Sequence, residues 1–153
     1  MASFEIVESI EITSPPEAVW RYRLDYTNLP DYNPSVSALE RVDDAEALGV
    51  GARYRFRVDM EAGPVESLLT VLEAAPYGRI VNDVDASDGT TVREVVTLVA
   101  IEKGTRLEIA ITGQQPDGVD NETRDAMISG GRALVQLELA NIKRALEANA
   151  PNA

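Results

Sequence analysis

Two residue types, cysteine and histidine, are absent from this sequence. Without cysteine the chain has no disulfide, no thiolate nucleophile and no Cys/His zinc site. Without histidine, Ser-His-Asp and Cys-His catalysis are excluded, as is acid–base catalysis by imidazole. We expect no metal site and no cofactor. Any catalysis would depend on carboxylates, tyrosine, lysine, arginine, amides, hydroxyls or a bound cofactor.

Long apolar runs and basic residues are also scarce. No run is long enough to cross a bilayer. The N-terminal sequence MASFEIVES has neither the basic start nor the apolar segment of a signal peptide, so we expect a cytoplasmic protein without membrane insertion. The net charge of −12, from 14 basic and 26 acidic residues, repels phosphates. Nucleic acid is therefore not an expected partner.

The length of 153 residues suits a single domain, which we predict over residues 1–148, with a frayed tail over 149–153. Alternation of apolar and polar residues predicts a first strand over 4–12. Ser14-Pro15-Pro16-Glu17 then predicts a helix start with Ser14 as the cap and Pro15 at the first position. This helix should end near Asp25. The composition leaves open a monomer or a homodimer.

The segment LDYTNLPDYNP, residues 24–34, interrupts the helix but stays partly apolar. Thr27 or Asn28 predicts the start of a second short helix. Asp25 and Asp31 look like a catalytic pair, but beside these turn residues we interpret them as helix caps. The apolar residues of the segment are expected to close one end of the sheet.

Residues 36–111 show the sequence pattern of antiparallel strands separated by turns. A turn at Ala62-Gly63 predicts that Phe56 faces Leu69. A turn at Lys103-Gly104 predicts that Val96 faces Ile111. The turn at Asp88-Gly89 must hold an odd number of residues, or a bulge, to keep the flanking strands in phase.

An apolar stripe at helical spacing predicts a long helix from about residue 121 to 148. Gly130-Gly131 implies either a later helix start or a kink or close approach to another element. These elements predict an α+β fold in which a curved seven-stranded antiparallel sheet wraps around the C-terminal helix, with two short helices after the first strand. Because one helix cannot fill such a concavity, either the sheet closes or a cavity remains.

The chain resembles the START-like or Bet v 1-like helix-grip superfamily (SRPBCC), in particular its polyketide cyclase/dehydrase-like branch. The resemblance rests on IEITSPPEAVW at residues 10–20, Asp25 with LPDYNP at 29–34, GVGARY at 49–54 and the end of the last helix at 142–147. It covers nearly the whole chain. Many relatives have tryptophan where this chain has Tyr32.

This resemblance implies an internal cavity for a hydrophobic small molecule of the lipid, polyketide or isoprenoid type. We favour a non-catalytic binder or carrier. The alternative is an aromatase/cyclase-like or dehydratase-like enzyme that uses cavity carboxylates, and a protein-interaction module is a third hypothesis. Fold alone does not choose among them.

The candidate catalytic residues are two carboxylates on inward strand phases, Glu94 and Glu8. A buried carboxylate must be paired or hold a proton. For Glu8 we favour a bulge at Val7 or an arginine partner; for Glu94 a functional and a structural role are evenly weighted. Asn82 is suited to bind a carbonyl or hydroxyl group, although a backbone partner is slightly favoured.

The other inward-facing positions are predicted to line the cavity without a chemical role. With Asn82 and Glu94, the predicted ligand-binding set comprises Tyr32, Tyr54, Phe56, Val58, Ser67, Leu69, Val96, Met127, Gly131 and Val135.

Overall fold

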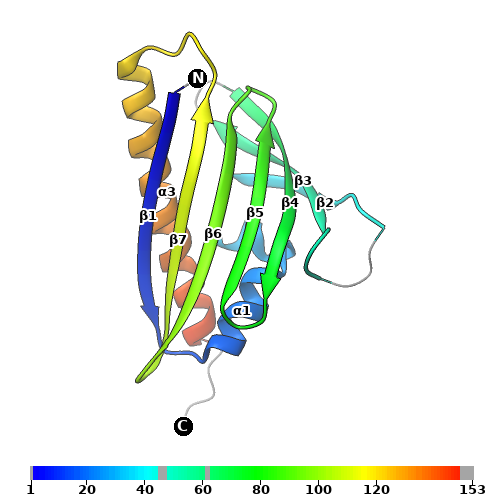
Figure 1. The fold of residues 1–153 in the computed structure, drawn as a ribbon, viewed down its shortest axis with the longest axis vertical. Helices are drawn as coiled ribbons and strands as arrows, with labels where there is room; N and C mark the ends of the chain where they lie inside the picture. Colours follow the sequence, from blue (N-terminus) through cyan, green and yellow to red (C-terminus); the bar gives the residue numbers. More distant parts are fainter. Residues whose placement is uncertain (1, 45–47, 61–62, 149–153) are drawn as a thin grey trace.

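The computed structural model describes residues 2–44, 48–60 and 63–148, drawn in Figure 1. The elements in chain order are β1 (Ala2–Ile12), α1 (Pro16–Leu24), a 3-10 turn η1 (Tyr26–Asn28), α2 (Leu29–Tyr32), β2 (Val36–Arg41), β3 (Arg53–Met60), β4 (Gly63–Ala75), β5 (Arg79–Ala86), β6 (Thr91–Ile101), β7 (Gly104–Gln115) and α3 (Asn121–Ala148).

The strands form one seven-stranded antiparallel sheet in the order β1-β7-β6-β5-β4-β3-β2. β1 joins β7, so the first and last strands of the chain are neighbours. The sheet curves so that β2 and β3 cross behind the long strands, and α3 runs beside β1 (Figure 1). The predicted α+β helix-grip architecture is confirmed. The side of the sheet toward α3 is called the inward face below.

Two predicted hairpin registers are wrong by two residues. Phe56 faces Ser67 rather than Leu69, and Val96 faces Ile109 rather than Ile111. In both hairpins the glycine assigned to the turn is the first residue of the following strand, at Gly63 and Gly104. Ala62 lies outside the described residues. Because side chains alternate with a period of two, a shift of two leaves each residue on its predicted face.

The turn between β5 and β6 is as predicted. The amide of Ala86 donates to the Thr90 carbonyl, which encloses the three residues 87–89, an odd number. Gly89, at φ 93°, supplies the left-handed conformation there. Val84 therefore faces Val92 and lies on the inward face with Val96.

The predicted cap of the first helix is wrong. α1 begins at Pro16, the residue before it is Pro15, and no side chain caps it. Ser14 lies one residue too early, and its carbonyl accepts a hydrogen bond from the Thr105 hydroxyl at 2.7 Å. The backbone of Ser14 thus joins α1 to the sheet instead.

The helix break is built by its predicted turn residues. Asp25 accepts hydrogen bonds from the amide of Thr27 at 3.1 Å and from its hydroxyl at 2.6 Å, which confirms Asp25 as a cap. Asp31 instead lies in the first turn of α2. Tyr26 and Tyr32 are 1% and 0% exposed, so these two aromatic residues attach the segment to the protein core.

α3 continues through both glycines without a break. A Cβ atom at Gly131 would lie 3.1 Å from Ile6 Cδ1, whereas one at Gly130 would meet nothing within 4 Å. Of the two alternatives, close approach is therefore correct, and it is Gly131 that brings α3 against β1.

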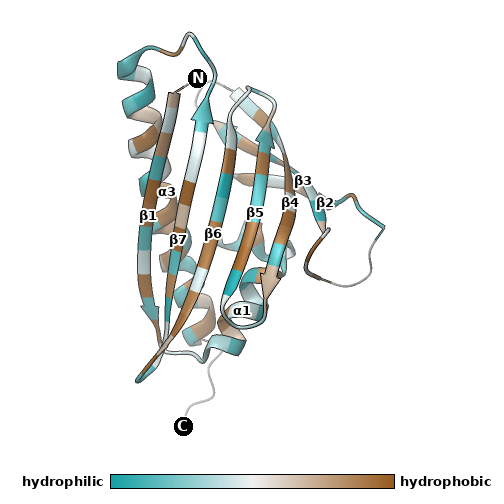
Figure 2. Cartoon of the chain, viewed as in Figure 1, coloured by the Kyte–Doolittle hydropathy of each residue, from teal (hydrophilic) through white to brown (hydrophobic). Residues whose placement is uncertain are grey.

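The inward face is packed unevenly along the strands. Near the Pro16 end of α1, Ile80, Val96 and Ile109 are 0% exposed. Toward the Asn121 end of α3, the inward apolar residues are only partly buried: Phe4, Val58, Val84, Val92, Ile111 and Ile128. Apolar and polar residues alternate along the strands in Figure 2, as a sheet with one buried face requires.

Gly104 is the glycine that the fold tolerates least. Its φ is 146°, and a Cβ there would lie 2.0 Å from the Ile12 carbonyl oxygen, a backbone atom of β1. We expect Gly104→Ala to lower the free energy of unfolding by more than about 2 kcal/mol. Urea unfolding followed by the fluorescence of Trp20 measures this.

Gly130→Ala is the matched control, since that position is open and helical. It should raise the free energy of unfolding by about 0.5 to 1 kcal/mol. Equal effects of the two substitutions would contradict the close approach of β7 to β1.

Candidate functional site

A buried arginine lies at the centre of the inward face. Arg23, on the last turn of α1, is 2% exposed, and its Nη2 donates to Oε1 of Glu94 on β6. The guanidinium carbon lies 5.1 Å from the ring centre of Tyr26 and 5.5 Å from that of Tyr32. Burial opposes the charge of Arg23, but Glu94 holds its pKa well above the ordinary value.

Asn82 completes the contact with Glu94. These two residues are direct partners across β5 and β6. The amide of Asn82 donates to Glu94 Oε1 at 2.8 Å and to the Tyr26 hydroxyl at 2.6 Å. Asn82 is 0% exposed, and its predicted backbone partner is replaced by these side chains. Glu94 stands on the inward face, where its side chain keeps 12% of its exposure.

A second carboxylate reaches the same region from α3. Glu138 is 8% exposed and accepts a hydrogen bond from the Asn33 amide at 2.7 Å. Burial, and then the charge of Glu94, raise the pKa of Glu138 to about 8, although Arg23 and Asn33 act in the opposite direction. Glu138 is therefore mostly protonated at neutral pH.

The tyrosines around Arg23 remain neutral hydroxyls. Burial raises the pKa of Tyr26 to about 12 and that of Tyr32 well above its ordinary value. The rings of Tyr26 and Tyr54 lie 5.3 Å apart between centres. We call Arg23, Tyr26, Tyr32, Asn33, Asn82, Glu94 and Glu138 the inner polar cluster.

Glu8 does not join this cluster. β1 pairs with β7 without a shift in register, so the predicted bulge at Val7 is wrong and Glu8 faces inward. The alternative of an arginine partner is correct: Arg132 of α3 donates to Glu8 at 2.8 Å. The pair links β1 to α3 at the edge of the sheet, with the two side chains 20% and 47% exposed.

The structure places the predicted lining residues on the inward side of the fold, with different burial. Tyr32, Tyr54, Phe56, Ser67, Leu69, Val96 and Val135 are buried. Val58, Met127 and Gly131 are partly exposed, toward the Asn121 end of α3. Of the predicted set, Tyr32, Asn82 and Glu94 are brought together around Arg23.

Four members of the cluster were not predicted from the sequence as site residues: Arg23, Tyr26, Asn33 and Glu138. The signal for two of them was helical spacing. Arg23 follows the buried Val19 by four residues, and Glu138 stands between Val135 and Ile142 at intervals of three and four. An ionisable residue on the apolar stripe of a helix indicates a buried group that must be paired or neutralised.

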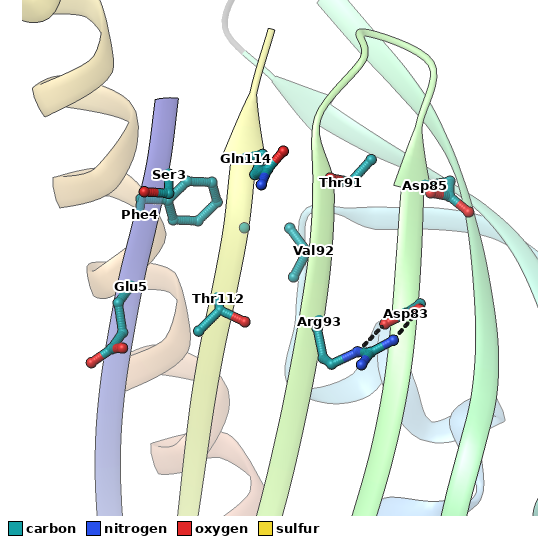
Figure 3. Close-up of a pocket in the computed structure, with 11 residues that line it drawn as sticks. Ser3, Phe4, Glu5, Asp83, Asp85, Thr91, Val92, Arg93, Thr112 and Gln114 are labelled. Atoms are coloured by element: carbon teal, nitrogen blue, oxygen red, sulfur yellow. Dashed lines mark hydrogen bonds and ion pairs between the residues drawn. The ribbon is translucent and has the colours of Figure 1, made fainter. Parts of the chain in front are cut away.

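A pocket of about 760 Å³ lies over β1, β7, β6 and β5, lined mostly by polar side chains of the outer face (Figure 3). It includes Glu5, Asp85 and the pair Arg93–Asp83, whose two hydrogen bonds measure 2.7 and 2.9 Å. Phe4 and Val92 of the inward face also line this pocket, but its charged outer-face side chains point away from the inner polar cluster. Such a lining does not suit an apolar ligand.

The described residues contain neither a cluster of metal ligands nor a membrane-spanning helix. In residues 2–44, 48–60 and 63–148, no three acidic side chains are grouped so that they would hold a metal ion. Nor is any helix in those ranges both long and apolar enough to cross a membrane.

The comparisons with known proteins concern the family and the fold of the chain. The family described as "Polyketide cyclase / dehydrase and lipid transport" matches residues 3–147. No curated relative matches the sequence.

Solved structures with the same fold include the aromatase/cyclase Zhui from Streptomyces sp. R1128, with a TM-score of 0.80 and 14% identity over 95% of this chain and 94% of that one. A START superfamily protein from Mycobacterium smegmatis has a TM-score of 0.79 and 11% identity over 95% and 99% of the two chains. The protein CV1439 from Chromobacterium violaceum has a TM-score of 0.70 and 19% identity over 94% and 97%. At these identities the likeness is one of fold.

Removing the charge of Arg23 should be strongly destabilising. Arg23→Met leaves Glu94 buried without its cation, so we expect the free energy of unfolding to fall by about 3 to 5 kcal/mol. The double variant Arg23→Met/Glu94→Gln should be more stable than the single one, because no unpaired charge remains. Urea unfolding of the two variants measures the difference.

Arg132→Met is the control, since the Glu8 pair is partly exposed. It should change stability by no more than about 1 kcal/mol. If the double variant is as unstable as Arg23→Met, the unpaired carboxylate is not the cause.

Glu138 should make stability fall as the pH rises. The folded protein holds the Glu138 proton more tightly than the unfolded chain, so its contribution is complete at acid pH. That contribution is lost between the ordinary carboxyl pKa and about 8, with a slope of at most about 1.4 kcal/mol per pH unit.

Glu138→Gln should remove this slope. The free energy of unfolding is measured for the unaltered protein and for Glu138→Gln from pH 5 to pH 9. Subtracting one from the other largely removes the contributions of the other titratable groups. A constant difference across this range would show that Glu138 is charged throughout.

Proposed function

Because the chain belongs to the polyketide cyclase/dehydrase and lipid transport family, we propose that it binds a hydrophobic small molecule on the inward side of its helix grip. The observation that carries the proposal is the inner polar cluster, whose buried polar atoms are set among apolar side chains. A few placed polar groups in an apolar surround are typical of ligand sites.

The ligand would lie at the partly exposed end of the inward face. Phe4, Val84 and Val92 form one cross-strand row with Gly113, directly beside the row that contains Asn82 and Glu94. These apolar side chains keep part of their exposure, and so does Glu94. An apolar molecule lying along this row would gain hydrophobic burial while its polar end reached the cluster.

Native mass spectrometry tests this proposal on protein purified without detergent or denaturant. We expect a co-purified molecule that is released on unfolding. In addition, the neutral apolar dye Nile red should bind the stripped protein with increased fluorescence.

Val92→Trp fills the proposed position and should weaken dye binding about tenfold or more. Thr91→Trp is the matched control on the same strand, because Thr91 is exposed on the outer face. No co-purified ligand and equal dye binding by both variants would refute the proposal.

A second candidate is an aromatase/cyclase-like enzyme, as in Zhui. The observation that favours it is Glu138, a buried carboxyl with a pKa of about 8 beside Arg23 and Tyr32. A carboxylic acid with a pKa near neutrality is suited to donate and recover a proton. In this version Arg23 and the Tyr32 hydroxyl would donate hydrogen bonds to substrate carbonyls, and Glu138 or Glu94 would move the proton.

Turnover of a poly-β-ketone substrate separates the two functions. If the protein is a cyclase, Glu138→Gln and Glu94→Gln should each lower turnover by about a hundredfold or more while substrate still binds. Glu8→Gln should keep turnover, because Glu8 is paired with Arg132 away from the cluster. Binding without any turnover by the unaltered protein would leave the binder as the function.

A further inference from the structure

Several buried polar atoms of the inner polar cluster have no hydrogen-bond partner among the described residues. They are Arg23 Nε and Nη1, the hydroxyl of Tyr32 and Oδ1 of Asn82. The hydroxyl of the neighbouring Tyr54 is also buried without a partner. A guanidinium nitrogen can only donate. The missing partner of Arg23 is therefore an acceptor atom.

These atoms are held in place by their surroundings. Arg23 lies over the rings of Tyr26 and Tyr32, while its Nη2 is anchored on Glu94. The amide nitrogen of Asn82 is likewise fixed by two hydrogen bonds. A buried polar group left without a partner costs about 1 to 3 kcal/mol. An acceptor oxygen delivered to Arg23 would therefore be bound by groups already in position.

The charge of the site decides whether a charged or a neutral acceptor group of the ligand is favoured. The positive charge of Arg23 is already balanced by the carboxylate of Glu94. A carboxylate ligand would bring a further buried negative charge, in a protein whose net charge is −12. A neutral carbonyl oxygen accepts the same hydrogen bonds without adding charge.

We propose that the buried end of the ligand is a neutral carbonyl group, whose oxygen accepts hydrogen bonds from the free guanidinium nitrogens of Arg23 and from the Tyr32 hydroxyl. This inference rests on the proposed binding function and narrows it to a ligand class: apolar ketones, quinones or esters, in preference to fatty acids. Glu94, the ion-pair partner of Arg23, keeps 12% of its side-chain exposure.

Three probes of equal length test the head group: 2-nonanone, 2-nonanol and nonanoate, titrated calorimetrically into the full chain at pH 7. We expect the ketone to bind about tenfold more tightly than the alcohol, and nonanoate to bind most weakly. With a ¹³C-labelled carbonyl, the C=O stretch of bound 2-nonanone should lie at lower frequency than in hexane, because the oxygen accepts hydrogen bonds.

The double variant Arg23→Met/Glu94→Gln removes the donors without leaving a buried charge. In this variant the affinity for 2-nonanone should fall about tenfold, and the C=O stretch should move toward its value in hexane. The matched control Arg132→Met/Glu8→Gln removes the ion pair between α3 and β1 and should leave both readouts unchanged.

The outcomes separate this inference from the function beneath it. If none of the three probes binds, the proposed function fails and the carbonyl inference fails with it. If all three bind equally, or nonanoate binds most tightly, the protein is a binder of apolar molecules but the carbonyl inference is overturned. A C=O stretch that is the same in the double variant and the unaltered protein also overturns it.

Discussion

The buried ion pair between Arg23 and Glu94 is the interaction on which the interior of this protein depends. A guanidinium that is 2% exposed is stable only if a carboxylate and further hydrogen bonds or ring faces surround it. Glu94, Tyr26 and Tyr32 provide that surrounding. The pair therefore fixes the end of α1 over β6.

The position of this pair explains the break after α1. The chain must turn at once so that Tyr26 and Tyr32 can cover the guanidinium, and Asp25 caps the turn. Beyond it, Asn33 donates to Glu138, and Asn141 donates to the carbonyl of Tyr32 at 3.0 Å. The segment is apolar where it covers Arg23 and polar where it is tied to α3. The interruption thus brings Tyr26, Tyr32 and Asn33 into the inner polar cluster.

The same arrangement separates a packed part of the molecule from a partly open one. Around Val96 and Ile109, side chains from the strands fill the inward face completely. Toward the Asn121 end of α3, Phe4, Val84 and Val92 remain partly exposed. The inner polar cluster stands at the boundary, where a ligand would meet fixed donors without disturbing the packed region.

Much of the fold could be predicted because it follows from local periodicity. Alternation placed Tyr54, Phe56 and Glu94 on the inward face, and the three-and-four spacing predicted α3. The hairpin registers were missed by two residues because a glycine near a turn can lie in the turn or begin the next strand. The inward face was nevertheless right, since a shift of two preserves the pleat. The predicted cap at Ser14 was wrong because α1 begins at Pro16, so that Pro15, which has no side-chain acceptor, precedes the helix.

The sequence by itself determined the fold class, the faces of the strands, the break after α1 and the absence of imidazole and thiol chemistry. These follow from residue types and short-range spacing. Only the tertiary structure decided that Glu8 pairs with Arg132 while Glu94 pairs with Arg23, and that Glu138 holds a proton near neutral pH. Charge pairing and desolvation depend on which distant residues come together, and no local pattern specifies that.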